Sequence, residues 1–386
     1  REKDENITFE HSKVRELVYD LIEPDRRSAM HLSAARCLES HLQADSPSYH
    51  GVLSHHYLRG GDTRKALELM LQMTEGPRGV LAAEGVVELM ASGVESLGWA
   101  PGDKGAAEFK ARVYMRLGDL LESLEDLDGS LAHYQRAANL CETEGLQTFL
   151  PPAYRRLGDL MLRSYRWDHA TDYYLRALHL AKRGDATVEI AQVFRGLGRM
   201  YHLKGDYPRA IECYLKYLEA PSHSKGRPYF LGMVGLGDVY KDLGDFNQAL
   251  VYYKVAVKTS EEYGLPSDIP LAYIRMARVL LHFNEMSDSE RMCEWAYTLA
   301  KELNRPHLTR EVTIHFAETM LDLGIIKRAE ESLQEFSDQG GPMEDRLLEA
   351  IFKRVSGILY SRIRDNDRAA RNLAASVSIL EDIQIP

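Results

Sequence analysis

One pattern returns at nearly regular intervals from residue 106 to the end of the chain, and it restricts the possible folds more than any other feature. Leu-Gly-Asp stands at 117–119, 157–159 and 236–238, and Leu-Gly-Arg stands at 197–199. The intervals between the four glycines are nearly equal, and further steps of the same length reach other small residues. The seven small positions are Gly118, Gly158, Gly198, Gly237, Ala277, Ala317 and Gly357. Such a period, about 40 residues long, predicts stacked repeats rather than a single core.

Two further registers accompany each small position. Twelve residues later stand the small residues Ser130, Ala170, Ala210, Ala249, Ser289, Ala329 and Ala369. Sixteen residues later stand the core-filling residues Tyr134, Tyr174, Tyr214, Tyr253, Cys293, Leu333 and Leu373. Small residues let two helices approach closely, and large residues between them fill the groove. We therefore predict two amphipathic helices in each of seven repeats.

The turns within the repeats carry helix-ending and helix-starting residues. The segments 204–210 (KGDYPRA) and 243–249 (LGDFNQA) place a glycine before an aspartate. Glycine permits the left-handed conformation that ends one helix, and aspartate caps the next. Prolines precede the first helix of several repeats, where they cost no helical hydrogen bond; they are Pro151, Pro152, Pro228, Pro270 and Pro306.

This pattern resembles the tetratricopeptide repeat, with Tyr154, Leu157, Gly158, Ala170, Tyr174 and Ala177 matching the family's spaced residues. The resemblance covers about 106–386, although the match weakens after Gly237. The period is also longer than the family's usual period of about 34 residues. The resemblance implies an all-α fold, a right-handed superhelix of stacked helix-turn-helix repeats, each about 40 residues long. The last repeat is expected to act as a cap.

The first hundred residues give a second resemblance. Phe9, His11, Val14, Arg15, Glu16, Tyr19 and Asp20 match a segment found downstream of the ATPase in bacterial STAND-type signalling NTPases. The resemblance implies a winged-helix-like remnant and linker helix over 1–45, degenerate helical repeats over 46–105 and seven repeats over 106–386. Because residue 1 is Arg, we expect the chain to be a piece of a longer protein. The resemblance implies that this parent carries an upstream NTPase module and a kinase, cyclase or DNA-binding output.

Composition excludes several classes of function. The chain is 45% hydrophobic and 27% charged, and no apolar run reaches the roughly 18–20 residues of a membrane span. The net charge of −10 argues against non-specific binding to nucleic acid or to an anionic membrane. The four cysteines are far apart in sequence, which favours a reducing, cytoplasmic location; they are Cys37, Cys141, Cys213 and Cys293.

We find no motif that predicts catalysis. The sequence has no GxxxxGK[ST] phosphate loop, no kinase catalytic loop and no HExxH. His50, His55 and His56 could hold a metal, but spacings of five and six residues do not place them on one helical face. Packed or solvated histidines are the simpler interpretation. We expect no enzyme activity, cofactor or metal in this chain.

The family resemblance indicates where a partner would bind. It places residues six and three before each small position, and one and four after it, on the concave face. In repeats one to four these positions hold Arg112, Asp119, Glu122, Arg155, Asp159, Arg195, Arg199, His202, Asp238 and Lys241. In repeats four to six they hold Val234, Ile274, Leu281, Ile314 and Leu321. The aliphatic residues either bind a partner or pack against a neighbouring helix.

We expect a non-catalytic interaction or sensor arm that binds a protein or peptide partner and regulates a larger signalling protein. The basic residues Arg155, Arg195, Arg199 and Lys241 would pair with an acidic segment, and the aliphatic residues would hold an amphipathic one. No nucleic acid or membrane is expected to bind. The alternatives are a free-standing repeat scaffold and a small-ligand sensor domain of a transcriptional regulator.

Overall fold

The structure is a computed structural model that describes residues 2–3, 6–7, 12–41, 47–74, 83–98, 102–124, 126–223, 225–266, 268–303, 305–338 and 345–385. The chain divides into two compact units, 1–153 and 154–386. The division falls inside helix α8 (Leu150–Arg163), away from the predicted boundaries after residues 45 and 105. The functional division of the chain therefore stays a prediction.

The first unit is helical apart from two short antiparallel strands, β1 (Glu2–Lys3) and β2 (Asn6–Ile7). Its helices are α1 (Ser12–Asp20), α2 (Pro24–His41), α3 (Pro47–Arg59), α4 (Thr63–Thr74), α5 (Ala83–Ser96), α6 (Lys104–Ser123) and α7 (Leu127–Thr143). Helices α3 and α4 pack as a pair, as do α6 and α7, which form repeat one. Phe9 and His11, which carried part of the second resemblance, lie outside the described residues.

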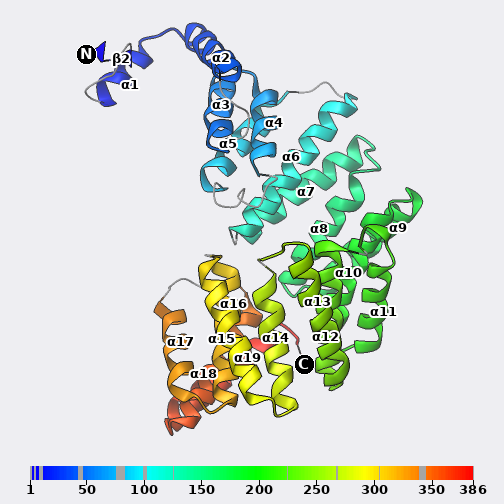
Figure 1. The fold of residues 1–386 in the computed structure, drawn as a ribbon. Coiled ribbons are helices and arrows are strands. Elements are labelled where there is room, and N and C mark those ends of the chain that lie inside the picture. The colour runs from blue at the N-terminus through cyan, green and yellow to red at the C-terminus, as the bar shows by residue number, and fades with distance from the viewer. Residues whose placement is uncertain are drawn as a thin grey trace. The chain divides into compact units, whose positions relative to one another are not determined.

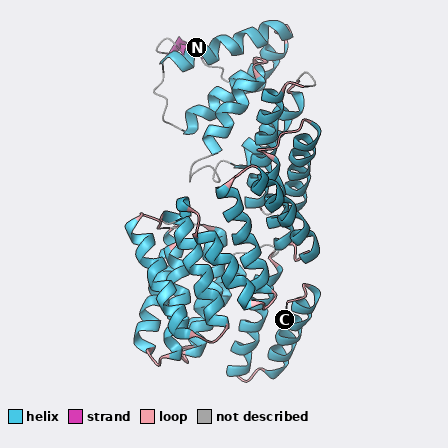
Figure 2. Cartoon of the chain, turned by 90° about the vertical axis from the view of Figure 1, so that its right-hand side faces the viewer, coloured by secondary structure: helices cyan, strands magenta, loops and turns pink. Residues whose placement is uncertain are grey.

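The second unit continues from α8 through repeats two to seven. Its remaining elements are α9 (Trp167–Arg183), α10 (Thr187–Leu203), α11 (Tyr207–Leu218), the 3-10 turn η2 (Pro221–His223), α12 (Gly226–Asp242), α13 (Phe246–Glu262), α14 (Ile269–His282), α15 (Met286–Glu302), α16 (Pro306–Asp322), α17 (Ile326–Asp338), α18 (Arg346–Arg362) and α19 (Asn366–Asp382). The two helices of a repeat pack against each other, from α10 with α11 to α18 with α19 (Figure 1). Helices dominate the described chain (Figure 2), which confirms the predicted all-α stack.

The small positions lie where a tyrosine ring packs against a helix backbone. A Cβ built on Gly158 would stand 2.8 Å from the Tyr174 ring, and one on Gly196 would stand 2.6 Å from the same ring. Tyr174 is thus held between the first helices of repeats two and three. Ala210 is fully buried in the same kind of contact between α10 and α11. The predicted role of the small residues is confirmed.

Seven residues after the small position, the backbone turns into the left-handed region. Glycine occupies this place in repeats three, four and six, as Gly205, Gly244 and Gly324. Tyr165 stands there in repeat two with φ 55°, and Arg364 stands there in repeat seven with φ 65°. A side chain in this conformation costs about 1–2 kcal/mol. Tyr165 must therefore be held by other contacts.

In the part of the chain that the structure describes, none of the helices has the length and apolar character needed to cross a membrane.

Candidate functional site

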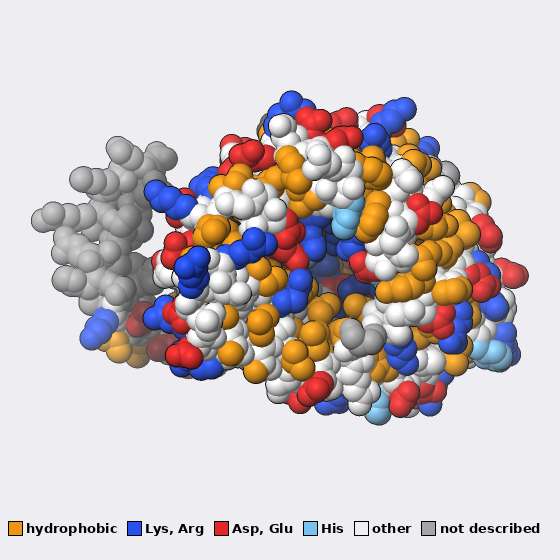
Figure 3. Space-filling model, turned by 90° about the horizontal axis from the view of Figure 1, so that it is seen from below, with side chains coloured by type: hydrophobic (Ala, Val, Ile, Leu, Met, Phe, Trp, Pro, Cys, Tyr) orange, Lys and Arg blue, Asp and Glu red, His pale blue; other side chains and the backbone are white. Residues whose placement is uncertain are grey.

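The inner charged lane consists of charged side chains on the first helices of repeats two to seven in the second unit. Arg199, on α10, is exposed to water, although atoms of the protein surround it closely. That combination describes a side chain inside a solvent-filled hollow. Figure 3 shows a hollow with Lys and Arg side chains in it, on the face drawn there. Water and a partner's polar groups can both reach such a place.

Two cations of the lane are paired with carboxylates on both sides. Arg155 lies 2.8 Å from Asp159 and 2.5 Å from Glu189, and its side chain is 14% exposed. Arg275 bridges two repeats in the same way, 3.3 Å from Asp238 and 3.2 Å from Glu311. Their guanidinium groups therefore already have acceptors.

A second cluster lies in repeats five to seven around the buried carboxylate of Glu318, which is 6% exposed. Arg278 approaches it to 3.0 Å and Arg354 to 2.7 Å. Burial by itself would raise the pKa of Glu318, but contact with His315 and the two arginine charges hold that pKa far below 4.5. Burial also lowers the pKa of His315, so its imidazole is neutral near pH 7.

Arg195 and Arg199 differ from these cations. Within the described residues, Arg195 Nε donates to Gln192 Oε1 at 3.2 Å and pairs with no carboxylate. Arg199 forms no ion pair within the same set of residues. Burial by itself would lower the pKa of Arg199, but surrounding groups, with Tyr214 and Asp159 among them, raise it above its usual value. The group is charged, enclosed and open to an added anion.

The aspartates of the lane accept hydrogen bonds from the tyrosines of their own repeats. The Tyr174 hydroxyl donates to Asp159 at 2.7 Å, and the Tyr253 hydroxyl donates to Asp238 at 2.7 Å. Lys241 lies 3.1 Å from Asp242, which also accepts from His202 at 2.8 Å. These contacts are internal and do not by themselves assign a partner.

Four of the five aliphatic candidates lie in the core rather than on a surface. Val234 is buried in one cluster, and Ile274, Ile314 and Leu321 are buried in another. Leu281 is half-buried. The aliphatic lane is therefore corrected to a packing role for these four, because α12, which carries Val234, contacts α14, while α14 contacts α16 and α16 contacts α18. These four residues therefore follow the alternative interpretation, in which they pack against a neighbouring helix.

Sequence reasoning did not single out Arg275, Arg278, Glu311 and Glu318. A signal was present for three of them, because Arg278 and Glu318 occupy the same repeat position as Arg199 and Glu311 stands six residues before a small position. Arg275 stands two residues before the small position, outside the four positions carried over from the family.

The first and last repeats of the second unit meet at Tyr165. Its hydroxyl donates to Asp345 Oδ1 at 3.2 Å and accepts from the Leu347 backbone N–H at 2.9 Å. We call these two hydrogen bonds the Tyr165 clasp. It joins the α8–α9 turn to the start of α18.

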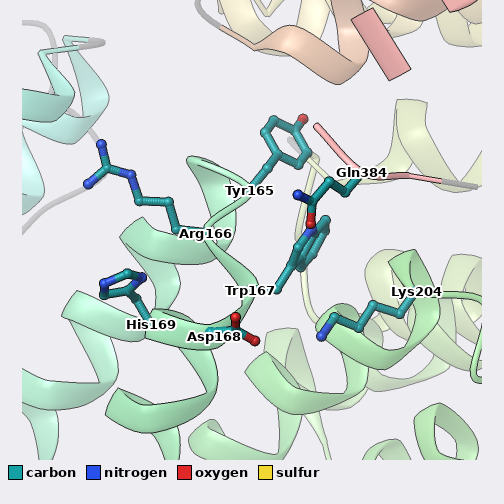
Figure 4. A pocket seen from close by; sticks show the side chains of 7 residues that line it. All are labelled: Tyr165, Arg166, Trp167, Asp168, His169, Lys204 and Gln384. Carbon is teal, nitrogen blue, oxygen red and sulfur yellow. The ribbon is translucent and has the colours of Figure 1, made fainter. Parts of the chain in front are cut away.

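A pocket of about 380 Å³ lies beside the clasp. Figure 4 shows Tyr165, Trp167 and Gln384 gathered on one side, while Arg166 and His169 point away. Among the described residues, Trp167 Nε1 is buried and has no hydrogen-bond partner, and the Lys204 ammonium lies 5.8 Å from the centre of the Trp167 ring. Asp168 completes the lining.

Two of the three histidines considered as metal ligands, His55 and His56, pack with His31. His31 Nδ1 lies 2.9 Å from His56 Nδ1, and the His55 ring lies against both. Burial is the main reason that the pKa values of His31 and His55 are lowered. Among the described residues, no group of three or more His, Cys, Asp or Glu could hold a metal ion.

Comparison with known proteins identifies the repeat and the fold. Models of the tetratricopeptide repeat match residues 111–144, 194–228 and 233–263. A search of curated proteins found no match.

Three solved structures are similar in fold. The STAND protein with a tetratricopeptide repeat sensor from Pyrococcus horikoshii is 12% identical, with a TM-score of 0.56 over 96% of this chain. The chain spans 56% of that protein's length. A Rap protein complexed with Competence and Sporulation Factor is 11% identical, with a TM-score of 0.58, covering 84% of this chain and 99% of that one. The Rap conjugation gene regulator of plasmid pLS20, in complex with the Phr* peptide, is 15% identical, with a TM-score of 0.61, covering 89% and 97%.

Proposed function

We propose that this chain, which carries tetratricopeptide repeats, is a non-catalytic arm that holds a partner segment in the second unit and regulates a larger signalling protein. One observation carries the proposal: Arg195 and Arg199 are cations that water can reach and that no described carboxylate neutralises. Such cations are accessible to the carboxylates of a partner. A segment bearing carboxylates would supply one.

All three similar folds support this function. The two Rap structures are complexes with Competence and Sporulation Factor and with the Phr* peptide, and the STAND protein has a tetratricopeptide repeat sensor. In our proposal the segment binds across the first helices of repeats two to five. Binding would then favour one conformation of the parent protein over another.

A photo-crosslinking experiment tests the location of the site. A photoreactive residue in place of Lys241, which lies on the inner side of α12, is expected to capture a segment from a peptide library. The same residue in place of Arg371, which is exposed on α19, serves as the control. Equal capture at both places, or capture at Arg371 alone, would remove the inner lane from the proposal.

A small-ligand sensor is the second candidate, and the pocket beside the Tyr165 clasp favours it. A volume of about 380 Å³ lies within the range of small-molecule sites, and Trp167 Nε1 offers an unused donor. Trp167→Phe would remove that donor and should abolish metabolite-induced thermal stabilisation. A metabolite that stabilises the variant and the wild type equally would exclude this pocket.

A further inference from the structure

The third repeat departs from its neighbours at one position. The residue after the small position is Asp119, Asp159 and Asp238 in repeats one, two and four. Each aspartate accepts a hydrogen bond from the tyrosine fifteen residues later, at 2.7–2.8 Å. In repeat three the acceptor is replaced by Arg199, while the tyrosine, Tyr214, is retained. Repeat three therefore has a hydrogen-bond donor at the position where repeats one, two and four have an acceptor.

Repeat three therefore holds two kinds of donor and lacks their acceptor. Tyr214 is 3% exposed and forms no hydrogen bond with the described residues. Burial raises the pKa of Tyr214, so the hydroxyl keeps its proton. A Cβ built on Gly198, the residue before Arg199, would stand 3.3 Å from the Tyr214 ring, and Arg195 lies one helical turn before Arg199 on α10, so the three side chains share one region. Arg199 is exposed to water, so an anion can reach these donors and supply the acceptor that they lack.

Repeat five shows that an arginine at this position does not always lack an acceptor. Arg278 occupies the register of Arg199, yet it lies 3.0 Å from Glu318. The tyrosine position of repeat five holds Cys293, which has no hydroxyl group. Of repeats three and five, only repeat three therefore has two donors without an acceptor among the described residues.

Two carboxylates that act on Arg199 electrostatically are already bound by other groups. Asp159 accepts from Arg155 and Tyr174, and Glu311 is paired with Arg275. Moving Asp159 to Arg199 would take the acceptor from the buried Tyr174 hydroxyl. An acceptor from outside the chain carries no such cost.

We propose that Arg199, Arg195 and the Tyr214 hydroxyl form an anion subsite for a carboxylate of the partner segment. The inference rests on the proposed function and specifies which group of the segment is recognised. A planar guanidinium can hold both oxygens of a carboxylate, and the hydroxyl can donate to one of them. The carboxylate would come from an Asp or Glu side chain or from a chain terminus. A phosphate presents similar oxygens, so the test must separate the two sources.

The sharpest variant is Arg199→Asp, because it restores the Leu-Gly-Asp motif of repeats one, two and four. Tyr214 would regain its acceptor, so the variant should melt at the same temperature as the wild type or above it. The same change should remove the subsite. If Arg199 had only a structural role, Arg199→Asp should instead lower the melting temperature and leave anion binding unchanged. Arg199→Ala is the second variant if Arg199→Asp fails to fold, and Arg371→Asp on exposed α19 is the matched charge control.

Titration calorimetry of the full chain measures the result, with N-acetylated tetraglutamate, tetraglutamine and inorganic phosphate as probes. The wild type and Arg371→Asp should bind tetraglutamate at least tenfold more tightly than tetraglutamine. Arg199→Asp should lose that preference, and Tyr214→Phe should reduce it. Inorganic phosphate that binds the wild type more tightly than tetraglutamate, and that Arg199→Asp no longer binds, would overturn the carboxylate source and assign the donors to phosphate.

Equal binding of tetraglutamate by the wild type and Arg199→Asp would overturn the subsite, and so would no binding of any probe. The proposed function is judged separately by crosslinking at position 241. The protein with the photoreactive residue at position 241 would be compared with and without Arg199→Asp. Capture of a segment by both would leave the proposed function intact and exclude only the subsite.

Discussion

Repeats two and three differ from repeats five and six at one shared position, three residues before the small residue. Arg155 and Arg195 stand there in the first pair, partly accessible to water. Ile274 and Ile314 stand there in the second pair, with no exposed surface. Helix α14 contacts α16 more extensively than α10 contacts α12. The approach of successive first helices, rather than the repeat register alone, decides whether this position binds or packs.

Exchanging the two kinds of residue should have the largest effect. Ile314→Arg would place an unpaired charge in the core of repeats five to seven, at a cost of roughly 3–5 kcal/mol in the free energy of unfolding. Arg195→Ile should change stability by less than about 1 kcal/mol. Urea denaturation would measure both variants. Similar losses would contradict the difference between the two regions.

Overpacking repeat three should have the next largest effect. Ala210→Leu would force extra volume into the buried contact between α10 and α11, costing on the order of 1–3 kcal/mol. Since repeats couple mainly to their neighbours, hydrogen exchange should increase most in repeats two to four. Ala374→Leu, at an exposed position of α19, is the control. Uniform loss of protection throughout the second unit would argue against a linear array.

Acid should weaken repeats five to seven before repeats two and three. The pKa of His315 is below 6.5, so the unfolded chain binds its proton first, and stability falls as the pH drops below 6.5. The pKa of Glu318 is below 4.5, so its contribution is lost as the pH falls further below 4.5. The raised pKa of Asp322 opposes this trend, because that carboxylate gains its proton more readily in the folded state.

Each pKa unit that separates the folded from the unfolded state changes stability by about 1.4 kcal/mol. Thermal melts from pH 7.5 to 3.5 would measure the fall, and Glu318→Gln should flatten its lower part. An unchanged profile in that variant would mean that other carboxylates control the acid response. Arg278 and Arg354 face Glu318 in the folded protein.

Charge reversal at the two arginines of repeat three should change stability least and partner binding most. Reversing Arg195 and Arg199 to Glu should alter the free energy of unfolding by less than about 1 kcal/mol. Each desolvated pair lost with an acidic partner should cost roughly 2–5 kcal/mol of affinity. Wild-type binding should also weaken as salt rises. Calorimetry on a crosslinked segment would decide, and equal affinities would exclude these two arginines.

The local sequence pattern was enough to predict the helices, but it did not predict which side chains are buried at every position. The regular period predicted the seven helix pairs, and the two small registers predicted where the helices touch, as at Ala210. The family resemblance also predicted that Arg199 lies on the concave face, and this stays a prediction. The sequence could not reveal that Val234 and Ile314 are buried, because burial depends on the distance between separate repeats. The hydrogen bond between Tyr165 and Asp345 joins positions far apart in the chain and has no periodic signal.

The Tyr165 clasp limits how this chain can evolve. An open solenoid can gain or lose a repeat, because each repeat contacts only its neighbours. Here an insertion of one repeat between α9 and α18 would separate Tyr165 from Asp345 and leave a left-handed tyrosine without its two hydrogen bonds. The number of repeats between the two ends is therefore fixed by a single side chain. A duplication that a simple stack would tolerate would be selected against here.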